Sequence, residues 1–79
     1  MTGPGIMTQE KLPTIEEAMQ EIRTKPTVPI WPTVGVVLEL SRGAAYDAAH
    51  RGDFETVRIG KLIKVVTAPL RRKLGIEAV

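Results

Sequence analysis

The sequence predicts a small α+β domain in which two short helices lead directly into a β-hairpin. Two changes of pattern support this prediction. Small apolar residues recur at helical spacing between Ser41 and Gly52, whereas apolar and basic residues alternate, as in strands, between residues 57 and 65. The chain has 79 residues, so its elements must share one small hydrophobic core.

Composition excludes several classes of protein. The sequence contains no cysteine and one histidine, so it offers neither a disulfide framework nor a protein-only zinc site. No apolar run approaches the ~20 residues of a membrane span, and the first residues lack the basic-then-apolar order of a signal peptide. We therefore expect a cytoplasmic protein without a metal, another cofactor or a membrane partner.

The positive charge is concentrated after Pro32. Residues 1–32 hold three basic and four acidic side chains, a net charge of −1, whereas residues 33–79 hold eight basic and five acidic ones, a net charge of +3. A basic face on a small domain favours a polyanionic partner, although an ordinary solvated surface fits the charge equally well.

Residues 1–32 are expected to form a flexible tail, an amphipathic helix and a proline-rich linker. Thr14 and Glu17 fit a capping box at the start of a helix of about nine residues. The apolar stripe of this helix would consist of Ile15, Ala18, Met19 and Ile22.

The linker is predicted from prolines at every third position. Pro26, Pro29 and Pro32 suit an extended connector with a solvated backbone. A ligand motif for a proline-binding domain is the alternative. Trp31 would anchor the linker to the core.

Residues 33–76 are expected to form the main folded domain. Thr33 is a suitable N-cap for a short helix over residues 34–38, and Ser41 and Gly52 are suitable first and last caps for the helix between them. Two short helices joined by a short turn form a helix-turn-helix. Thr67 would cap a last helix that ends at Gly75, and the stripe of small side chains in the second helix would consist of Ala45, Ala48 and Ala49.

The register of the hairpin is predicted from its side-chain pattern. A two-residue loop at Gly60 and Lys61 would mix apolar and charged residues on both faces. A three-residue loop, Gly60 to Leu62, would give one buried and one cationic face. It would pair Ile59 with Ile63, Arg58 with Lys64 and Val57 with Val65. A basic wing of this kind can lie along a DNA backbone or enter the minor groove, so the predicted fold is a winged helix-turn-helix with an extra N-terminal helix.

The candidate DNA-binding residues lie on the exposed face of the second helix and on the hairpin. Arg42 could contact a guanine or a phosphate, and Asp47 could accept from a cytosine or, preferably, orient Arg51. The small residues Gly43 and Ala44 would allow close approach to DNA, so that DNA shape supplies part of the specificity. The full set is Ser41, Arg42, Gly43, Ala44, Tyr46, Asp47, His50, Arg51, Arg58, Lys61 and Lys64.

Four short motifs together resemble a known family. Leu40-Ser41-Arg42, Ala45-Tyr46, Arg51-Gly52 and the run from Val57 to Lys61 are similar, in order and spacing, to the excisionase-like, MerR-related winged helix-turn-helix family of phages and actinobacteria. The resemblance covers residues 32–76. It implies a recognition helix that begins at the Ser-Arg pair and a wing formed by the hairpin.

The resemblance also implies a function. Proteins of this family bind and bend DNA, bind cooperatively to tandem sites and direct a phage integrase toward prophage excision. We therefore expect a non-enzymatic excisionase whose partners are duplex DNA, an integrase and further copies of itself, in the cytoplasm of a prokaryotic host. The alternatives are a transcriptional regulator of the same fold and a protein-interaction adaptor such as an antitoxin. No placed nucleophile and base, phosphate-binding glycine loop or metal cluster suggests an enzyme.

Overall fold

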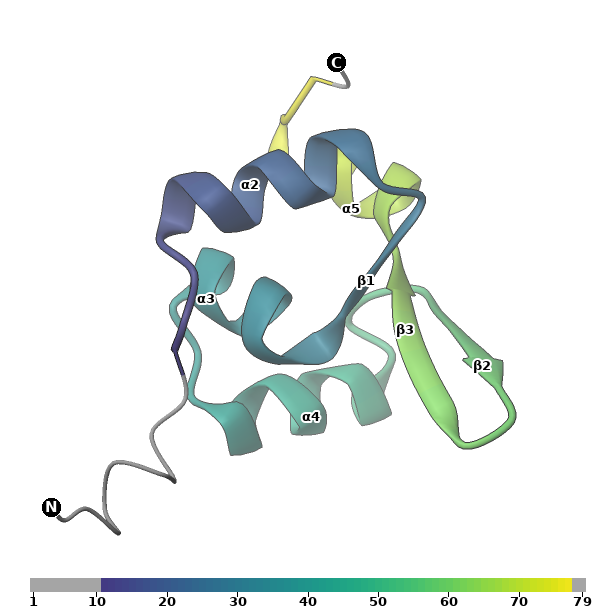
Figure 1. Cartoon of the computed structure of the whole chain (residues 1–79). Helices are drawn as coiled ribbons and strands as arrows, with labels where there is room; N and C mark the ends of the chain where they lie inside the picture. The colour runs from purple at the N-terminus through teal and green to yellow at the C-terminus, as the bar shows by residue number, and fades with distance from the viewer. Residues whose placement is uncertain (1–10, 78–79) are drawn as a thin grey trace, which may run out of the picture.

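The computed structural model describes residues 11–77 (Figure 1). These residues form a small α+β fold, as the sequence predicts, with four α-helices and a three-stranded antiparallel sheet. In chain order the elements are α2 (Ile15–Thr24), β1 (Thr27–Pro29), the irregular helical turn η1 (Ile30–Val34), α3 (Gly35–Leu38), α4 (Arg42–Arg51), β2 (Thr56–Ile59), β3 (Leu62–Val66) and α5 (Thr67–Leu74). Most of the predicted flexible tail lies outside the described residues.

Helix α2 begins as its sequence predicts. The Glu17 amide donates to the Thr14 hydroxyl at 3.1 Å, and the Thr14 amide donates to the Glu17 carboxylate at 2.9 Å, which completes a capping box. Ala18 and Ile22 on the predicted stripe are fully buried, whereas Ile15 in the first turn is 46% exposed.

The proline-rich segment is extended, but its predicted solvated backbone is wrong. β1 pairs antiparallel with β3, so that Val28 lies opposite Val65, and the side chains of both are fully buried. The sheet order is β1-β3-β2, which makes β1 an edge strand. Proline is tolerated at a sheet edge because its missing N–H group can face away from the neighbouring strand. The segment from Val28 to Ile30 is therefore part of the same core as α4.

The short helix predicted over residues 34–38 occurs as α3, but its predicted cap is wrong. Thr33 is 2% exposed, and its hydroxyl donates to the Glu21 carboxylate of α2 at 2.9 Å instead of capping α3. Gly35 lies against Trp31. A Cβ atom at Gly35 would overlap the Trp31 ring, so the indole can rest on α3 only where there is no side chain.

Helix α4 has both predicted caps. The Ser41 hydroxyl accepts from the Ala44 amide at 3.1 Å, and Gly52 ends the helix with a φ of +85°. Ala45 and Ala48 are buried. In Figure 1, α4 runs along one side of the molecule, α2 and α5 lie on the other, and η1 and α3 lie between them.

The predicted register of the hairpin is wrong. Ile59 pairs with Leu62, and Arg58 pairs with Ile63, so the loop contains only Gly60 and Lys61. Gly60 has a φ of +60°, as the first position of a type II′ turn requires, and such two-residue loops match the twist of the paired strands. Mixing charged and apolar side chains is tolerated because all four residues of β2 are exposed.

Helix α5 ends at Gly75, which has a φ of +71°, as predicted. The predicted cap at its start is wrong, because Thr67 is fully buried and its hydroxyl donates to the backbone carbonyls of Lys25 and, at 2.9 Å, Pro26. The Arg71 guanidinium donates to the Ile22 carbonyl at 2.9 Å and to the Thr67 hydroxyl at 3.0 Å. These bonds hold α5 against the end of α2.

Candidate nucleic-acid interface

The outer face of α4 is the centre of the candidate interface. Gly43, Tyr46 and His50 lie on this face, opposite the buried Ala45 and Ala48, because residues three or four apart share one side of a helix. All three are exposed, and Tyr46 is 38% exposed. Gly43 has no side chain, so a partner could come close to the α4 backbone at this position of the face.

Ser41 and Arg42 lie at the N-terminus of the same helix, and both are exposed. The Ser41 side chain is occupied as the N-cap. Ala44 is half-buried, so it belongs to the flank of α4 and not to its outer face.

A groove separates α4 from the hairpin. It has a volume of about 340 Å³, and Tyr46 forms its α4 side. The hairpin side consists of the four residues from Lys61 to Lys64, and Pro29 and Ile30 complete the lining. Tyr46 and two of the predicted hairpin cations, Lys61 and Lys64, therefore share one concave surface.

The other flank of α4 faces a second groove. This groove has a volume of about 440 Å³ and lies between α3, α4 and α5. Its apolar lining includes Leu38, Phe54 and Leu70, and Asp47 and Arg51 also line it. The structure thus divides the predicted α4 residues between two surfaces, with Asp47 and Arg51 on the side away from the hairpin.

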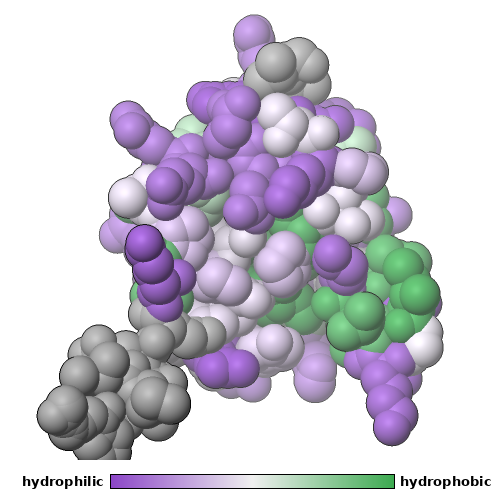
Figure 2. Space-filling model, in the orientation of Figure 1, coloured by the Kyte–Doolittle hydropathy of each residue, from purple (hydrophilic) through white to green (hydrophobic). Residues whose placement is uncertain are grey.

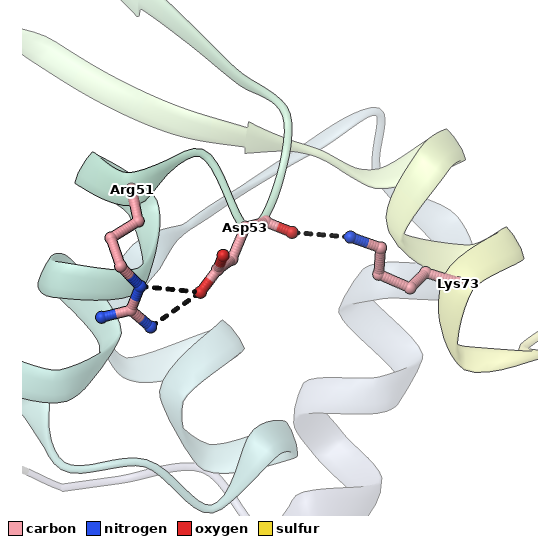
Figure 3. A network of polar contacts seen from close by, with 3 residues as sticks. All are labelled: Arg51, Asp53 and Lys73. Atoms are coloured by element: carbon pink, nitrogen blue, oxygen red, sulfur yellow. Dashed lines mark hydrogen bonds and ion pairs between the residues drawn. The ribbon is translucent and has the colours of Figure 1, made fainter.

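Arg51 has a different partner from the one predicted. Its guanidinium donates to the Asp53 carboxylate at 2.7 and 3.2 Å, and the Lys73 ammonium donates to the Asp53 carbonyl at 2.7 Å (Figure 3). The preferred role for Asp47, orienting Arg51, is therefore wrong. The left-handed conformation of Gly52 turns the chain back at the end of α4, which brings Asp53 beside Arg51.

The cations of the hairpin do not share one face. In the observed register Arg58 lies opposite Ile63, on the face that Val65 buries, whereas Lys64 lies opposite Val57 on the outer face. Lys61 occupies the turn. The predicted single cationic face is therefore wrong, and the cations surround the end of the hairpin instead.

Apart from Lys64, the outer face of the hairpin is apolar, whereas the sequence led us to expect a cationic face. Figure 2 shows a hydrophobic patch over the hairpin, bordered by hydrophilic side chains. The exposed fractions of its side chains are 37% for Val57, 59% for Ile59 and 65% for Leu62. The signal in the sequence was Gly60, because a glycine at the first loop position favours the two-residue loop that turns these three side chains outward.

Searches of protein-family models, curated proteins and solved structures found no match to this chain. Among residues 11–77, no helix has the length and apolar character needed to cross a lipid bilayer.

Proposed function

We propose that this protein binds duplex DNA, with α4 in the major groove and the β2–β3 hairpin beside it as a wing. The observation that carries this proposal is the pairing of two neighbouring elements. One is a helix with an exposed polar face, and the other is a hairpin whose residues 56–66 include three basic side chains and no acidic one.

Helix α4 has suitable dimensions and chemistry for this role. The major groove of B-form DNA accepts an α-helix. Gly43 on the outer face lets the backbone approach the base edges, and His50 and Tyr46 provide hydrogen-bonding groups for bases or phosphates. Arg42, one turn earlier, supplies the positive charge.

The spread of cations over the hairpin also suits DNA. A groove has a phosphate backbone on each side, so a hairpin that enters it meets negative charge on both of its faces. Arg58 and Lys64 project from opposite faces, and Lys61 lies at the turn between them. Each of the three could therefore neutralise a phosphate when the hairpin is inserted.

Within this function we propose the architectural role of an excisionase, which bends attachment-site DNA, associates with further copies on tandem sites and directs an integrase. The support is the order and spacing of the motifs between Leu40 and Lys61. A transcriptional regulator would use the same DNA-binding surface. An excision assay with an integrase and its attachment sites, with and without this protein, separates the two roles, since only an excisionase raises the yield of excised product.

DNA binding is tested by gel shift on random-sequence duplexes at low and moderate salt. Replacing Arg58, Lys61 and Lys64 together with alanine should lower affinity tenfold or more on every sequence and reduce the salt slope by up to about three units. The matched control replaces Arg23, Lys25 and Arg72, which lie on α2, beyond its end and on α5. This control has the same net charge but should retain most of the affinity. An equal loss in both variants would contradict the wing assignment.

A protein-interaction adaptor is the second candidate. The observation in its favour is the apolar groove between α3, α4 and α5, which could receive side chains of a partner protein. The same gel shift decides between the candidates, because an adaptor would leave DNA unbound even at low salt.

A further inference from the structure

The end of the hairpin carries two large apolar side chains in water. Ile59 and Leu62 face each other across the strands immediately before the turn. They are 59% and 65% exposed, more than the other large hydrophobic residues in the described part of the chain. Clustered apolar side chains at a projecting tip are unusual in a protein without a binding partner for them.

The surroundings of this pair are basic. Lys61 follows Ile59 by two residues in the turn, and Lys64 lies on the same outer face as Leu62, since residues two apart share a face of a strand. Arg58 projects from the opposite face. An apolar tip with cations around it and no acidic residue between positions 56 and 66 is complementary to a polyanion that also offers an apolar interior.

Duplex DNA has both properties. Its phosphates attract the three cations, and its stacked bases form an apolar interior that can open at a base step. Proteins that kink DNA insert apolar side chains such as leucine and isoleucine between base pairs from the minor groove. The tip of a hairpin can deliver such side chains because the backbone turns back directly behind them.

We propose that Ile59 and Leu62 form a wedge that enters the minor groove, partly unstacks one base step and kinks the duplex. This inference rests on the proposed DNA-binding function and assigns different roles to the basic and the apolar residues of the hairpin. Arg58, Lys61 and Lys64 supply affinity through the phosphates, whereas Ile59 and Leu62 supply the bend. Pyrimidine–purine steps should be the preferred points of entry because they unstack most easily.

The test is ring closure of DNA, which requires no knowledge of a target sequence. A linear duplex of about 120 base pairs is shorter than the ~150-base-pair persistence length and closes poorly under ligase unless a protein bends it. Wild-type protein should raise the yield of circles. The variant with Ile59→Thr and Leu62→Thr keeps good strand formers and should lose about tenfold in circle yield at equal occupancy of the DNA, with occupancy set by gel shift.

Two control variants test whether a loss of ring closure is specific to the removal of apolar side chains from the tip. The variant with Leu12→Thr and Ile15→Thr removes two side chains of 45% and 46% exposure away from the hairpin and should close rings like wild type. The exchange of Ile59→Leu with Leu62→Ile keeps the wedge apolar and should retain ring closure. Circular dichroism of each variant confirms that it is folded.

The outcomes separate the wedge from the proposed function. If wild type binds no DNA, the proposed function fails. If the double threonine variant binds and closes rings as well as wild type, the wedge is wrong and DNA binding stands. If that variant instead loses self-association in sedimentation while keeping its bend, the tip is a protein contact and the wedge is also wrong.

Discussion

The α2–α5 junction and the tip of the hairpin distribute polar and apolar groups in opposite ways. We define the junction as Thr33, Thr67 and Arg71 with the α2-side groups they bind. It buries two hydroxyls, with Thr67 fully buried and Thr33 2% exposed. The tip leaves Ile59 and Leu62 more than half exposed.

Because of this difference, we expect the junction to stabilise the fold and the tip to bind a partner. Each buried hydroxyl at the junction donates to an oxygen in the segment from Glu21 to Pro26, so removing either hydroxyl removes a hydrogen bond between packed elements. The exposed side chains at the tip contribute little to the folded state, because solvent reaches them before and after unfolding. Substitutions at the junction should therefore change stability, and those at the tip should change binding.

The largest effect on stability is expected for Thr67→Val. The change keeps the shape of the side chain but removes the one O–H donor that the Lys25 and Pro26 carbonyls share. The Pro26 carbonyl keeps the Thr67 amide as a donor at 3.0 Å, whereas the Lys25 carbonyl loses the Thr67 hydroxyl. The free energy of unfolding should fall by about 2 kcal/mol, measured by urea denaturation. Thr67→Ser should retain most of the stability, and an equal loss in both variants would show that the hydroxyl is not the cause.

A somewhat smaller loss is expected for Arg71→Met. The Arg71 side chain is half-buried, and its guanidinium satisfies the Ile22 carbonyl near the end of α2. Methionine fills similar space without a donor, so the free energy of unfolding should fall by roughly 1.5 kcal/mol. The exposed neighbour Arg72 provides the matched control, and Arg72→Met should have almost no effect in the same urea titration.

Thr33→Val should cost about 1 kcal/mol. Its hydroxyl donates to a single acceptor, the Glu21 carboxylate, which is only half-buried and can exchange its lost donor for water. Thermal denaturation followed by circular dichroism measures the change. A loss as large as that of Thr67→Val would mean that solvent does not reach Glu21 after the substitution.

The smallest effect on stability is expected at the tip. The variant with Ile59→Thr and Leu62→Thr should unfold within about 0.5 kcal/mol of wild type, measured by urea denaturation in the absence of DNA. A loss of 1 kcal/mol or more would show that the tip supports the fold, and the contrast between the two regions would then be wrong.

The local features of the fold were predictable from the sequence. The capping box at Thr14, the cap at Ser41 and the helix ends at Gly52 and Gly75 all occur where predicted. Each depends on residues within four positions of one another, so neighbouring sequence contains the whole interaction. The exposed position of the outer α4 residues follows from helical periodicity in the same way.

The grouping of the candidate residues on the surface was not predictable from the sequence. The sequence places Asp47 and Arg51 on the exposed side of α4, yet it does not show that a second groove lies beside them or that Asp53 binds Arg51. Likewise, the alternation of apolar and basic residues in the hairpin is evident from the sequence, but the pairing of its strands is not. Its register depended on one glycine in the turn and on the solvent exposure of an edge strand.

The roles of the threonine hydroxyls could not all be predicted from the sequence alone. A threonine hydroxyl can cap the next helix or bind a distant carbonyl, and both uses look the same in the sequence. Thr14 caps its helix, whereas Thr67 binds carbonyls more than forty residues away, at Lys25 and Pro26. The choice depends on whether the hydroxyl itself is buried, as it is in Thr67, because a buried hydroxyl without a partner costs more free energy than an uncapped helix end that water can reach. That arrangement exists only after α2, the sheet and α5 have packed together.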